Sequence, residues 1–349
     1  MSISIEKQIG QLIIAGFRGK TIKHNNKIVN YINDYNIGGV ILYDEDLAIG
    51  GSGTRNIESP SQVKELVDQL QNVGNNNLLI SIDQEGGEVN RLRNIYGFND
   101  TPAWNHIGLL NNELITMQFS KSMATTLSNL GINLNFAPVL DLDHGIGTVI
   151  SDSNRAFSSD PKIVKKNSKI FIDQHRASGI ITCGKHFPGL GSASGDTHEG
   201  FTDISDTWTV KDLLPFDELI RENNLDMVMI SHAFDKKLDP IYPASLSKTI
   251  INDMLRNDLG FNGPVICDDP SMRAISNHYS IHDTFELMLN AGVDLFCLGN
   301  NLIYDPQYIP KSIQAIVDLV DSKKIKPERI AESIIRINKL KKKYDIIKR

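Results

Sequence analysis

The sequence predicts an α/β protein, a single (β/α)8 TIM barrel with its active site at the C-terminal ends of the strands. Short apolar runs alternate with longer amphipathic stretches along 349 residues. The runs are apolar on both faces, which is typical of parallel strands covered by helices on each side. Eight such units suit one barrel of this length. A doubly wound open sheet also fits, because the alternation alone does not establish that the sheet closes.

The elements are predicted in chain order from their apolar spacing. Strands are expected at residues 12–15, 39–42, 78–82, 134–139, 179–182, 227–230, 264–267 and 294–298. Helical spacing between them predicts helices at 61–73, 114–130, 161–177, 246–259 and 281–291. Two further helices are expected at 310–322 and 327–343, so that one domain spans residues 1–349, with the helices of about 310–345 included.

Composition excludes several classes of partner. The net charge of -6 and the pI near 5.9 argue against nucleic acid or an anionic membrane surface. No apolar run approaches the length that spans a bilayer, and no signal peptide is recognisable. We therefore expect a cytoplasmic protein that is a monomer or weak dimer, with no nucleic-acid or membrane partner.

The three cysteines, Cys183, Cys267 and Cys297, all lie within apolar runs. A small odd number in such positions predicts buried, reduced thiols. No two of them have metal-ligand spacing, and His186 and His198 have no third ligand at a suitable distance along the chain. No metal and no cofactor are expected.

Segment 183–199 holds the densest group of candidate catalytic and binding residues. It follows the fifth apolar run and contains several Gly and Pro. This composition predicts a loop. The segment contains Lys185, His186, Asp196 and His198. Asp196 is close enough to hold one imidazole nitrogen of His198 and so prepare it as a proton shuttle near neutral pH. Any one of these residues alone could equally belong to an ordinary solvated surface loop.

Polar residues also follow other predicted strands. Asp83, Gln84 and Glu85 come after the third strand, Asp141 and Asp143 after the fourth, Ser231 and His232 after the sixth, and Asp268 and Asp269 after the seventh. Active sites of TIM barrels lie at this end of the strands. We therefore expect these side chains to meet at one site.

Together these motifs resemble glycoside hydrolase family 3, and most closely its single-domain bacterial β-N-acetylglucosaminidases. The resemblance covers nearly the whole chain, from Gly10 to Asp294. It lies in Lys185-His186-Phe187-Pro188-Gly189 followed by Asp196-Thr197-His198, in Asp83-Gln84-Glu85-Gly86-Gly87 with Arg91, in Ala137–Asp141 and in Asn154–Pro161. The chain departs from the family pattern at Leu190, where His is usual, and at Glu88, where Arg is usual.

The resemblance implies a role for each matched residue. It assigns Asp268 as the nucleophile and the Asp196–His198 dyad as the acid/base. It places six residues at the sugar: Asp83, Arg91, Arg155, Lys185, His186 and His232. Other interpretations remain open. Arg155 could pair with Asp160 at a helix start, His232 could serve packing, and the two adjacent aspartates could form only a turn.

The activity implied is that of a retaining, exo-acting β-N-acetylglucosaminidase (β-N-acetylhexosaminidase) that forms a covalent glycosyl-Asp intermediate. Its partner would be a small carbohydrate, an N-acetylglucosamine-containing glycoside or muropeptide, in peptidoglycan turnover and recycling. The alternatives are a β-glucosidase or β-xylosidase, an N-acetylglucosaminide phosphorylase of the same fold, and a sugar-binding protein without catalysis.

Overall fold

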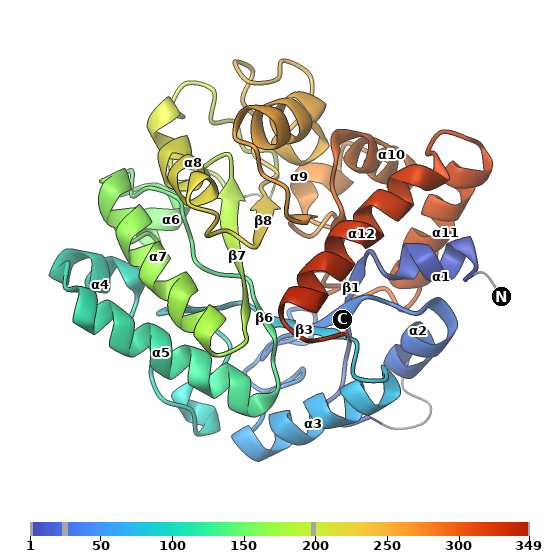
Figure 1. The fold of residues 1–349 in the computed structure, drawn as a ribbon, viewed down its shortest axis with the longest axis horizontal. Coiled ribbons are helices and arrows are strands. Elements are labelled where there is room, and N and C mark those ends of the chain that lie inside the picture. The colour runs from blue at the N-terminus through green and yellow to red at the C-terminus, as the bar shows by residue number, and fades with distance from the viewer. Residues whose placement is uncertain (1–2, 23–26, 197–199, 348–349) are drawn as a thin grey trace.

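Parallel strands close into a barrel in the computed structural model, which describes residues 3–22, 27–196 and 200–347. The order around the barrel is β1-β10-β9-β8-β7-β6-β3-β2, and every neighbouring pair is parallel. The predicted closed (β/α)8 barrel is therefore confirmed (Figure 1). The strands are β1 (Ile13–Gly16), β2 (Gly39–Leu42), β3 (Leu79–Ile82), β6 (Leu134–Asn135), β7 (Ile181–Phe187), β8 (Met227–Ile230), β9 (Val265–Cys267) and β10 (Leu295–Leu298).

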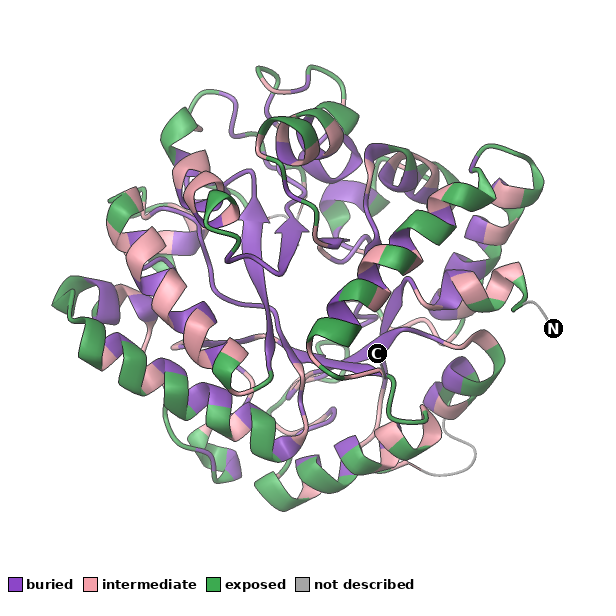
Figure 2. Ribbon diagram, in the orientation of Figure 1, coloured by how far each residue is buried: buried purple, intermediate pink, exposed green. Residues whose placement is uncertain are grey.

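Helices surround the barrel, with their apolar sides turned to the strands and their polar sides to solvent (Figure 2). The longer ones are α2 (Lys27–Tyr35), α3 (Pro60–Val73), α5 (Glu113–Leu130), α7 (Pro161–Ala177), α8 (Leu214–Arg221), the π-helix η4 (Thr249–Asp258), α10 (Ile281–Ala291), α11 (Tyr308–Asp321) and α12 (Pro327–Lys343). The short ones are α1 (Ile5–Gly10), η1 (Asn94–Tyr96), α4 (Trp104–Leu110), α6 (Val149–Asp152), η2 (Val210–Leu213), η3 (Ala244–Leu246) and α9 (Arg273–Ser276). None of the helices described is both long and apolar enough to cross a bilayer.

Local capping explains why most helix boundaries were predictable. Ser59 and Asp160 accept hydrogen bonds from first-turn N–H groups of α3 and α7, and each of these helices starts with Pro. The predicted helix at 246–259 is different, because the chain forms η3 and then the π-helix η4 there. The predicted strand at 134–139 shortens to β6, whose two residues pair with β3 and β7.

The prediction that the chain leaves the fifth strand near Cys183 is wrong. β7 continues to Phe187, so Lys185 and His186 lie on a strand. The backbone of this part is paired: Cys183 N donates to Ala137 O, Lys185 N to Pro138 O, and Leu140 N to Lys185 O. These hydrogen bonds hold an extended chain despite its Gly content, which fixes both polar side chains on a rigid element.

A small hairpin, which the sequence analysis did not predict, follows β3. β4 (Gln84–Gly86) and β5 (Val89–Asn90) pair antiparallel across a turn. Gly86 and Gly87 have φ of +104° and +60°, a region that residues with a side chain rarely adopt. The hairpin directs Glu85 inward, where its side chain is buried.

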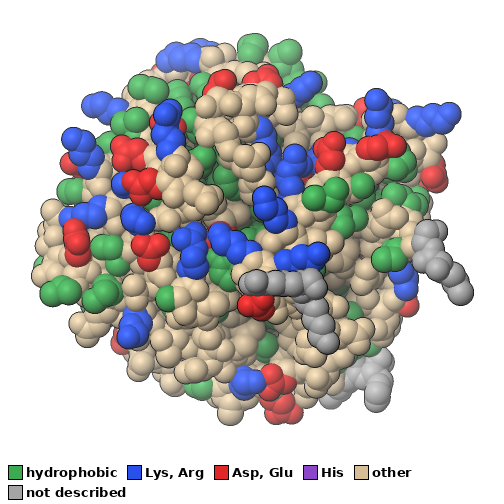
Figure 3. Space-filling view, in the orientation of Figure 1, with side chains coloured by type: hydrophobic (Ala, Val, Ile, Leu, Met, Phe, Trp, Pro, Cys, Tyr) green, Lys and Arg blue, Asp and Glu red, His purple; other side chains and the backbone are tan. Residues whose placement is uncertain are grey.

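The C-terminal helix α12 crosses the face where the strands begin, and it lies at the front of Figure 1. Lys and Arg side chains gather around its C-terminal half (Figure 3). Lys341 points the other way and is buried, with its Nζ donating to Gly38 O at 3.1 Å and to Asn77 O at 2.9 Å. These carbonyls precede β2 and β3, so Lys341 fastens α12 to the barrel. Burial lowers the pKa of Lys341 to about 8.

This depressed pKa predicts a pH-dependent stability. An unfolded lysine has a pKa of about 10.4, so between about pH 8 and pH 10.4 only the unfolded chain holds this proton. Stability should therefore rise over that window by about 3 kcal/mol from Lys341 alone. Urea unfolding measured across the window should show that the rise is smaller by this amount in Lys341→Met. If the free energy of unfolding rose equally with pH in both proteins, the depressed pKa of Lys341 would be contradicted.

Candidate active site

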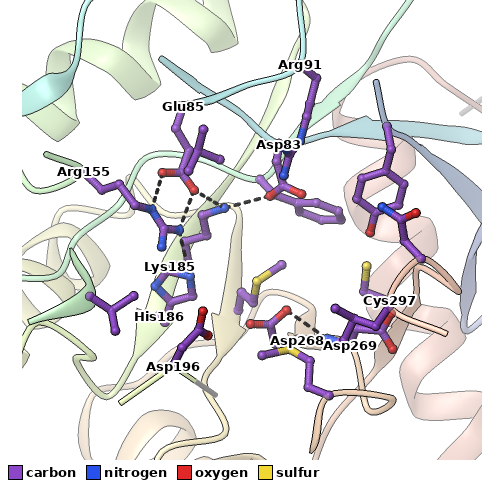
Figure 4. Close-up of a pocket in the computed structure, with 18 of the residues that line it drawn as sticks. Asp83, Glu85, Arg91, Arg155, Lys185, His186, Asp196, Asp268, Asp269 and Cys297 are labelled. Carbon is purple, nitrogen blue, oxygen red and sulfur yellow. Dashed lines mark hydrogen bonds and ion pairs between the residues drawn. The ribbon is translucent and has the colours of Figure 1, made fainter. Parts of the chain in front are cut away.

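A cavity of about 230 Å3 opens at the C-terminal ends of the strands. The structure brings seven of the nine predicted site residues to its wall: Asp83, Arg91, Arg155, Lys185, His186, Asp196 and Asp268 (Figure 4). Two predicted residues require separate statements. His198 lies outside the described residues, and His232 does not line this cavity.

Glu85 is the centre of the charge network in the cavity. Arg155 binds it through two parallel hydrogen bonds of 2.8 Å, from Nε to Oε2 and from Nη2 to Oε1. Lys185 Nζ lies 2.6 Å from Glu85 Oε1 (Figure 4). Burial alone would raise the pKa of this carboxyl, but Arg155 and Lys185 outweigh it and hold the pKa well below the usual range. Glu85 is therefore a buried anion that orients two cations.

The alternative pairing of Arg155 with Asp160 is wrong. Asp160 instead caps α7, with its Oδ1 accepting a hydrogen bond from Lys162 N at 2.9 Å. Arg155 turns into the cavity toward Glu85, and its Nη2 also lies 3.4 Å from His186 Nε2. Arg155 thus lines the cavity, and its role as the sugar-facing arginine stays a prediction.

Lys185 joins Glu85 to a second acid, Asp83. Its Nζ donates to Asp83 Oδ1 at 2.8 Å. Burial would lower the pKa of Lys185, but Asp83 and Glu85 raise it, so the amine stays protonated. The Asp83 side chain is 18% exposed, whereas that of Glu85 is 1% exposed. Asp83 is thus the acceptor that a ligand in the cavity can reach, and charged groups with fixed partners bind sugar hydroxyls with defined geometry.

His186 is fixed by Asp141, a residue whose site role the sequence analysis did not assign. His186 Nδ1 lies 2.6 Å from Asp141 Oδ2, so the carboxylate accepts a hydrogen bond from the Nδ1–H group, and Nε2 faces Arg155. Asp141 also accepts hydrogen bonds from the backbone N–H groups of His186 and Leu190. One buried carboxylate therefore sets both the imidazole and the start of the following loop.

The two adjacent aspartates after β9 have different surroundings. Asp268 reaches the cavity, and its Oδ1 accepts a hydrogen bond from Asp269 N at 2.9 Å. Asp269 is held by the backbone N–H groups of Ser271 and Gly299, each at 2.9 Å. Burial raises the pKa of Asp269 to about 6. Both residues line the cavity, and Asp268 is the more exposed of the two.

His232 lies behind this pair. It is 1% exposed; its Nδ1 is 2.7 Å from Ser245 Oγ and its Nε2 is 3.1 Å from the backbone oxygen of Asp269. His232 is not among the residues that line the cavity, and its role at the sugar stays a prediction. His232 supports the main chain next to Asp268, which agrees with the packing interpretation.

The two departures from the family pattern have simple structural settings. Leu190 is buried in a small apolar cluster with Ala193, Ile204, Ala233 and Trp208, and its backbone N–H still binds Asp141. Glu88 is exposed at the turn of the β4–β5 hairpin and is absent from the cavity wall. Neither substitution removes a charged partner that the structure shows in the network.

Sequence reasoning expected Glu85 and Asp141 to lie at the site, as polar residues that follow strands, but it gave neither of them a role. Glu85 is two residues after Asp83, and Asp141 is the first acid after the fourth predicted strand. The available signal was the expectation that ionisable residues at these strand ends converge. In the described part of the chain, no group of three or more His, Cys, Asp or Glu side chains could hold a metal ion.

A closed parallel barrel that brings carboxylates and fixed cations together at its strand ends can serve many reactions, and glycoside hydrolysis, which uses carboxylates beside a bound sugar, is one of them. The comparison with protein families agrees: the chain belongs to the family described as glycosyl hydrolase family 3 N terminal domain, whose model matches residues 4–340.

The alignments with similar proteins extend over most of the chain. Beta-hexosaminidases of Nitrosomonas eutropha and Hydrogenovibrio crunogenus are each 35% identical to it; the matches cover 76% and 85% of this chain and 74% and 82% of theirs. The family 3 beta-N-acetylglucosaminidase structure from Paenibacillus has a TM-score of 0.89 at 29% identity, over 99% of this chain and 63% of that longer one. Beta-N-acetylhexosaminidase from Beutenbergia cavernae has a TM-score of 0.85 at 28% identity, over 97% and 99% of the two chains.

Proposed function

We propose that this glycoside hydrolase is a retaining, exo-acting β-N-acetylglucosaminidase in which Asp268 is the nucleophile. The observation that carries the proposal is that Asp268 shares one cavity with Asp83, Arg155, Lys185 and His186. The printed names of the similar proteins support the choice of N-acetylhexosamine as substrate.

Recognition in this proposal begins with the fixed charges. Asp83 and Lys185 offer an acceptor and a donor to neighbouring sugar hydroxyls, and Arg155 and His186 offer polar groups beside them. Their partners Glu85 and Asp141 are already bound, so little reorganisation is needed when the sugar enters. Exo action is part of the proposal: the buried charges of Lys185 and Glu85 would surround the non-reducing-end sugar.

The reaction then takes two steps. Asp268 attacks the anomeric carbon, and the bond to the leaving oxygen breaks while His198, oriented by Asp196, gives that oxygen a proton. A glycosyl–Asp268 ester results. His198 next takes a proton from water, whose oxygen attacks the anomeric carbon and releases the Asp268 carboxylate. Two displacements on opposite faces give net retention. The role of His198 is inferred from the sequence, because the residue lies outside the described part of the chain.

The natural substrate in this proposal is an N-acetylglucosamine-containing glycoside or muropeptide from peptidoglycan turnover and recycling. A cytoplasmic setting agrees with three buried free cysteines, Cys183, Cys267 and Cys297. We propose that the enzyme acts as a monomer or weak dimer.

Substrate preference tests the proposal. Release of para-nitrophenol from the N-acetyl-β-D-glucosaminide should exceed release from the β-D-glucoside and β-D-xyloside by about 100-fold in kcat/KM, because sites built for a polar group discriminate strongly. Equal or faster release from the glucoside would contradict the specificity. The same assay with inorganic phosphate should give free N-acetylglucosamine, and a sugar 1-phosphate product would instead indicate a phosphorylase.

A further inference from the structure

A second cavity lies at the opposite end of the barrel, on the face where the strands begin. Its volume is about 320 Å3, and it lies between the end of α8, the loop before β9 and the C-terminal half of α12. This volume falls in the range of cavities that bind small organic molecules. The hydrolysis reaction does not use this cavity, so a ligand here would be separate from the sugar substrate.

Cations of α12 form one wall of this cavity. Arg336, Lys339 and Lys343 follow one another at helical spacing and all line it. Lys339 makes no hydrogen bond or ion pair with any residue in the described ranges, whereas Lys343 pairs with Asp226 at the cavity wall. The Lys and Arg side chains near the C-terminal half of α12 in Figure 3 lie on this face. This local excess of positive charge stands out in a chain with a net charge of -6.

Asp294, buried behind the wall, does not neutralise this charge. Three guanidinium groups share its single carboxylate: Arg256 at 2.6 Å, and Arg329 and Arg336 at 3.2 Å each. Ser333 Oγ and Val265 N also donate to it, so its acceptor sites are fully used. Arg336 reaches it only through Nη1 among the described residues, which leaves the N–H groups of Nε and Nη2 for another acceptor.

The rest of the wall is partly apolar and partly amide. The apolar residues are Ile220, Leu225, Phe261, Pro264 and Leu340. Asn223 and Asn262 add neutral hydrogen-bonding groups. A bare inorganic ion would leave this apolar surface in water, whereas an anion with an apolar body would cover it.

We propose that this cavity binds a small organic phosphate monoester, with its phosphate at Arg336 and Lys339 and its apolar body against Phe261 and Leu340. A doubly charged phosphate suits Lys339 together with Arg336, which shares its only anion, Asp294, with two other arginines among the described residues, and the planar fork of Arg336 can donate two hydrogen bonds to it. The cavity is at the other end of the barrel from Asp268, so the proposal does not depend on the glycosidase mechanism.

Isothermal titration of the whole protein with phenyl phosphate tests the site. We expect saturable binding with a Kd of about 1 mM or lower. Arg336→Gln should weaken binding about tenfold, because it removes charge-assisted hydrogen bonds. Lys339→Gln should weaken binding about threefold; it breaks no contact seen in the described residues, so it should fold normally even if Arg336→Gln is destabilised. Inorganic phosphate should bind more weakly than phenyl phosphate.

Lys342→Gln is the matched control, since this exposed lysine is on the same helix but outside the cavity. Its affinity for phenyl phosphate should equal that of the unaltered protein. An equal loss in Lys342→Gln and Lys339→Gln would show general surface attraction and overturn the proposal. The absence of saturable binding up to roughly 10 mM would do the same, since a ligand must be near its Kd to occupy a site.

Discussion

Asp268→Ala is expected to lower kcat for N-acetyl-β-glucosaminide hydrolysis by about 10³-fold or more, because no other group in the proposed mechanism can form the glycosyl ester. Asp269 is a poorer replacement, since its carboxylate is buried and accepts hydrogen bonds from the backbone N–H groups of Ser271 and Gly299. Sugar affinity should change little, because Asp83, Arg155 and Lys185 keep their contacts. Steady-state kinetics and N-acetylglucosamine titration measure the two effects.

Azide gives this variant a sharper readout. With the Asp268 carboxylate removed, azide can enter the vacated space, attack the anomeric carbon and give the α-glycosyl azide. Rescue with this product identifies the missing group as the nucleophile. Asp206→Ala is the control, because this carboxylate is exposed and away from the cavity wall, and its kinetics should be unchanged. Near-normal turnover by Asp268→Ala would remove Asp268 from the mechanism.

Glu85→Gln is expected to reduce the free energy of unfolding by about 3–5 kcal/mol at pH 7, because it leaves Arg155 and Lys185 buried without their shared anion. Activity should fall with it, since the same anion orients both cations at the sugar. Urea unfolding measures the first effect and kcat/KM the second. The loss in activity should persist at temperatures where the variant is fully folded.

The pH dependence of this effect follows from the lowered pKa of Glu85. A depressed folded-state pKa contributes stability above the unfolded value of about 4.3, and that stability is lost as pH falls through the folded pKa. The difference in free energy of unfolding between the unaltered protein and Glu85→Gln should therefore be full at pH 7 and should decrease below about pH 4. Glu88→Gln, at the exposed hairpin turn, should change stability by less than about 0.5 kcal/mol. Equal urea midpoints for Glu85→Gln and Glu88→Gln would contradict the buried-anion role.

Much of the fold follows from local rules. The helix over 161–177 was predicted with its final boundaries, because Asp160 and Pro161 form a recognisable start. Closure of the barrel did not follow from the pattern, since it depends on which edge strands pair, here β1 with β10. The extension of β7 to Phe187 was missed for the same reason, as neighbouring strands satisfy a backbone that its Gly content marked as a loop.

Site residues that lie at the ends of strands could be predicted from the sequence. Side-chain partners and orientations, which depend on packing, could not. Asp83, Lys185 and Asp268 follow or end strands, so their convergence was expected and is observed. The partner of Arg155 was not predictable, because Glu85 is 70 positions away in the sequence. His232 also follows a strand, yet it turns behind Asp269, since sequence position does not determine which way a side chain points.

The stereochemistry of hydrolysis tests the central claim most directly. Proton NMR can follow para-nitrophenyl N-acetyl-β-D-glucosaminide during its first turnovers, before the released sugar mutarotates. A double displacement through Asp268 predicts that β-N-acetylglucosamine appears first and that the α anomer accumulates later. Initial release of the α anomer would mean a single displacement by water and would contradict Asp268 as the nucleophile.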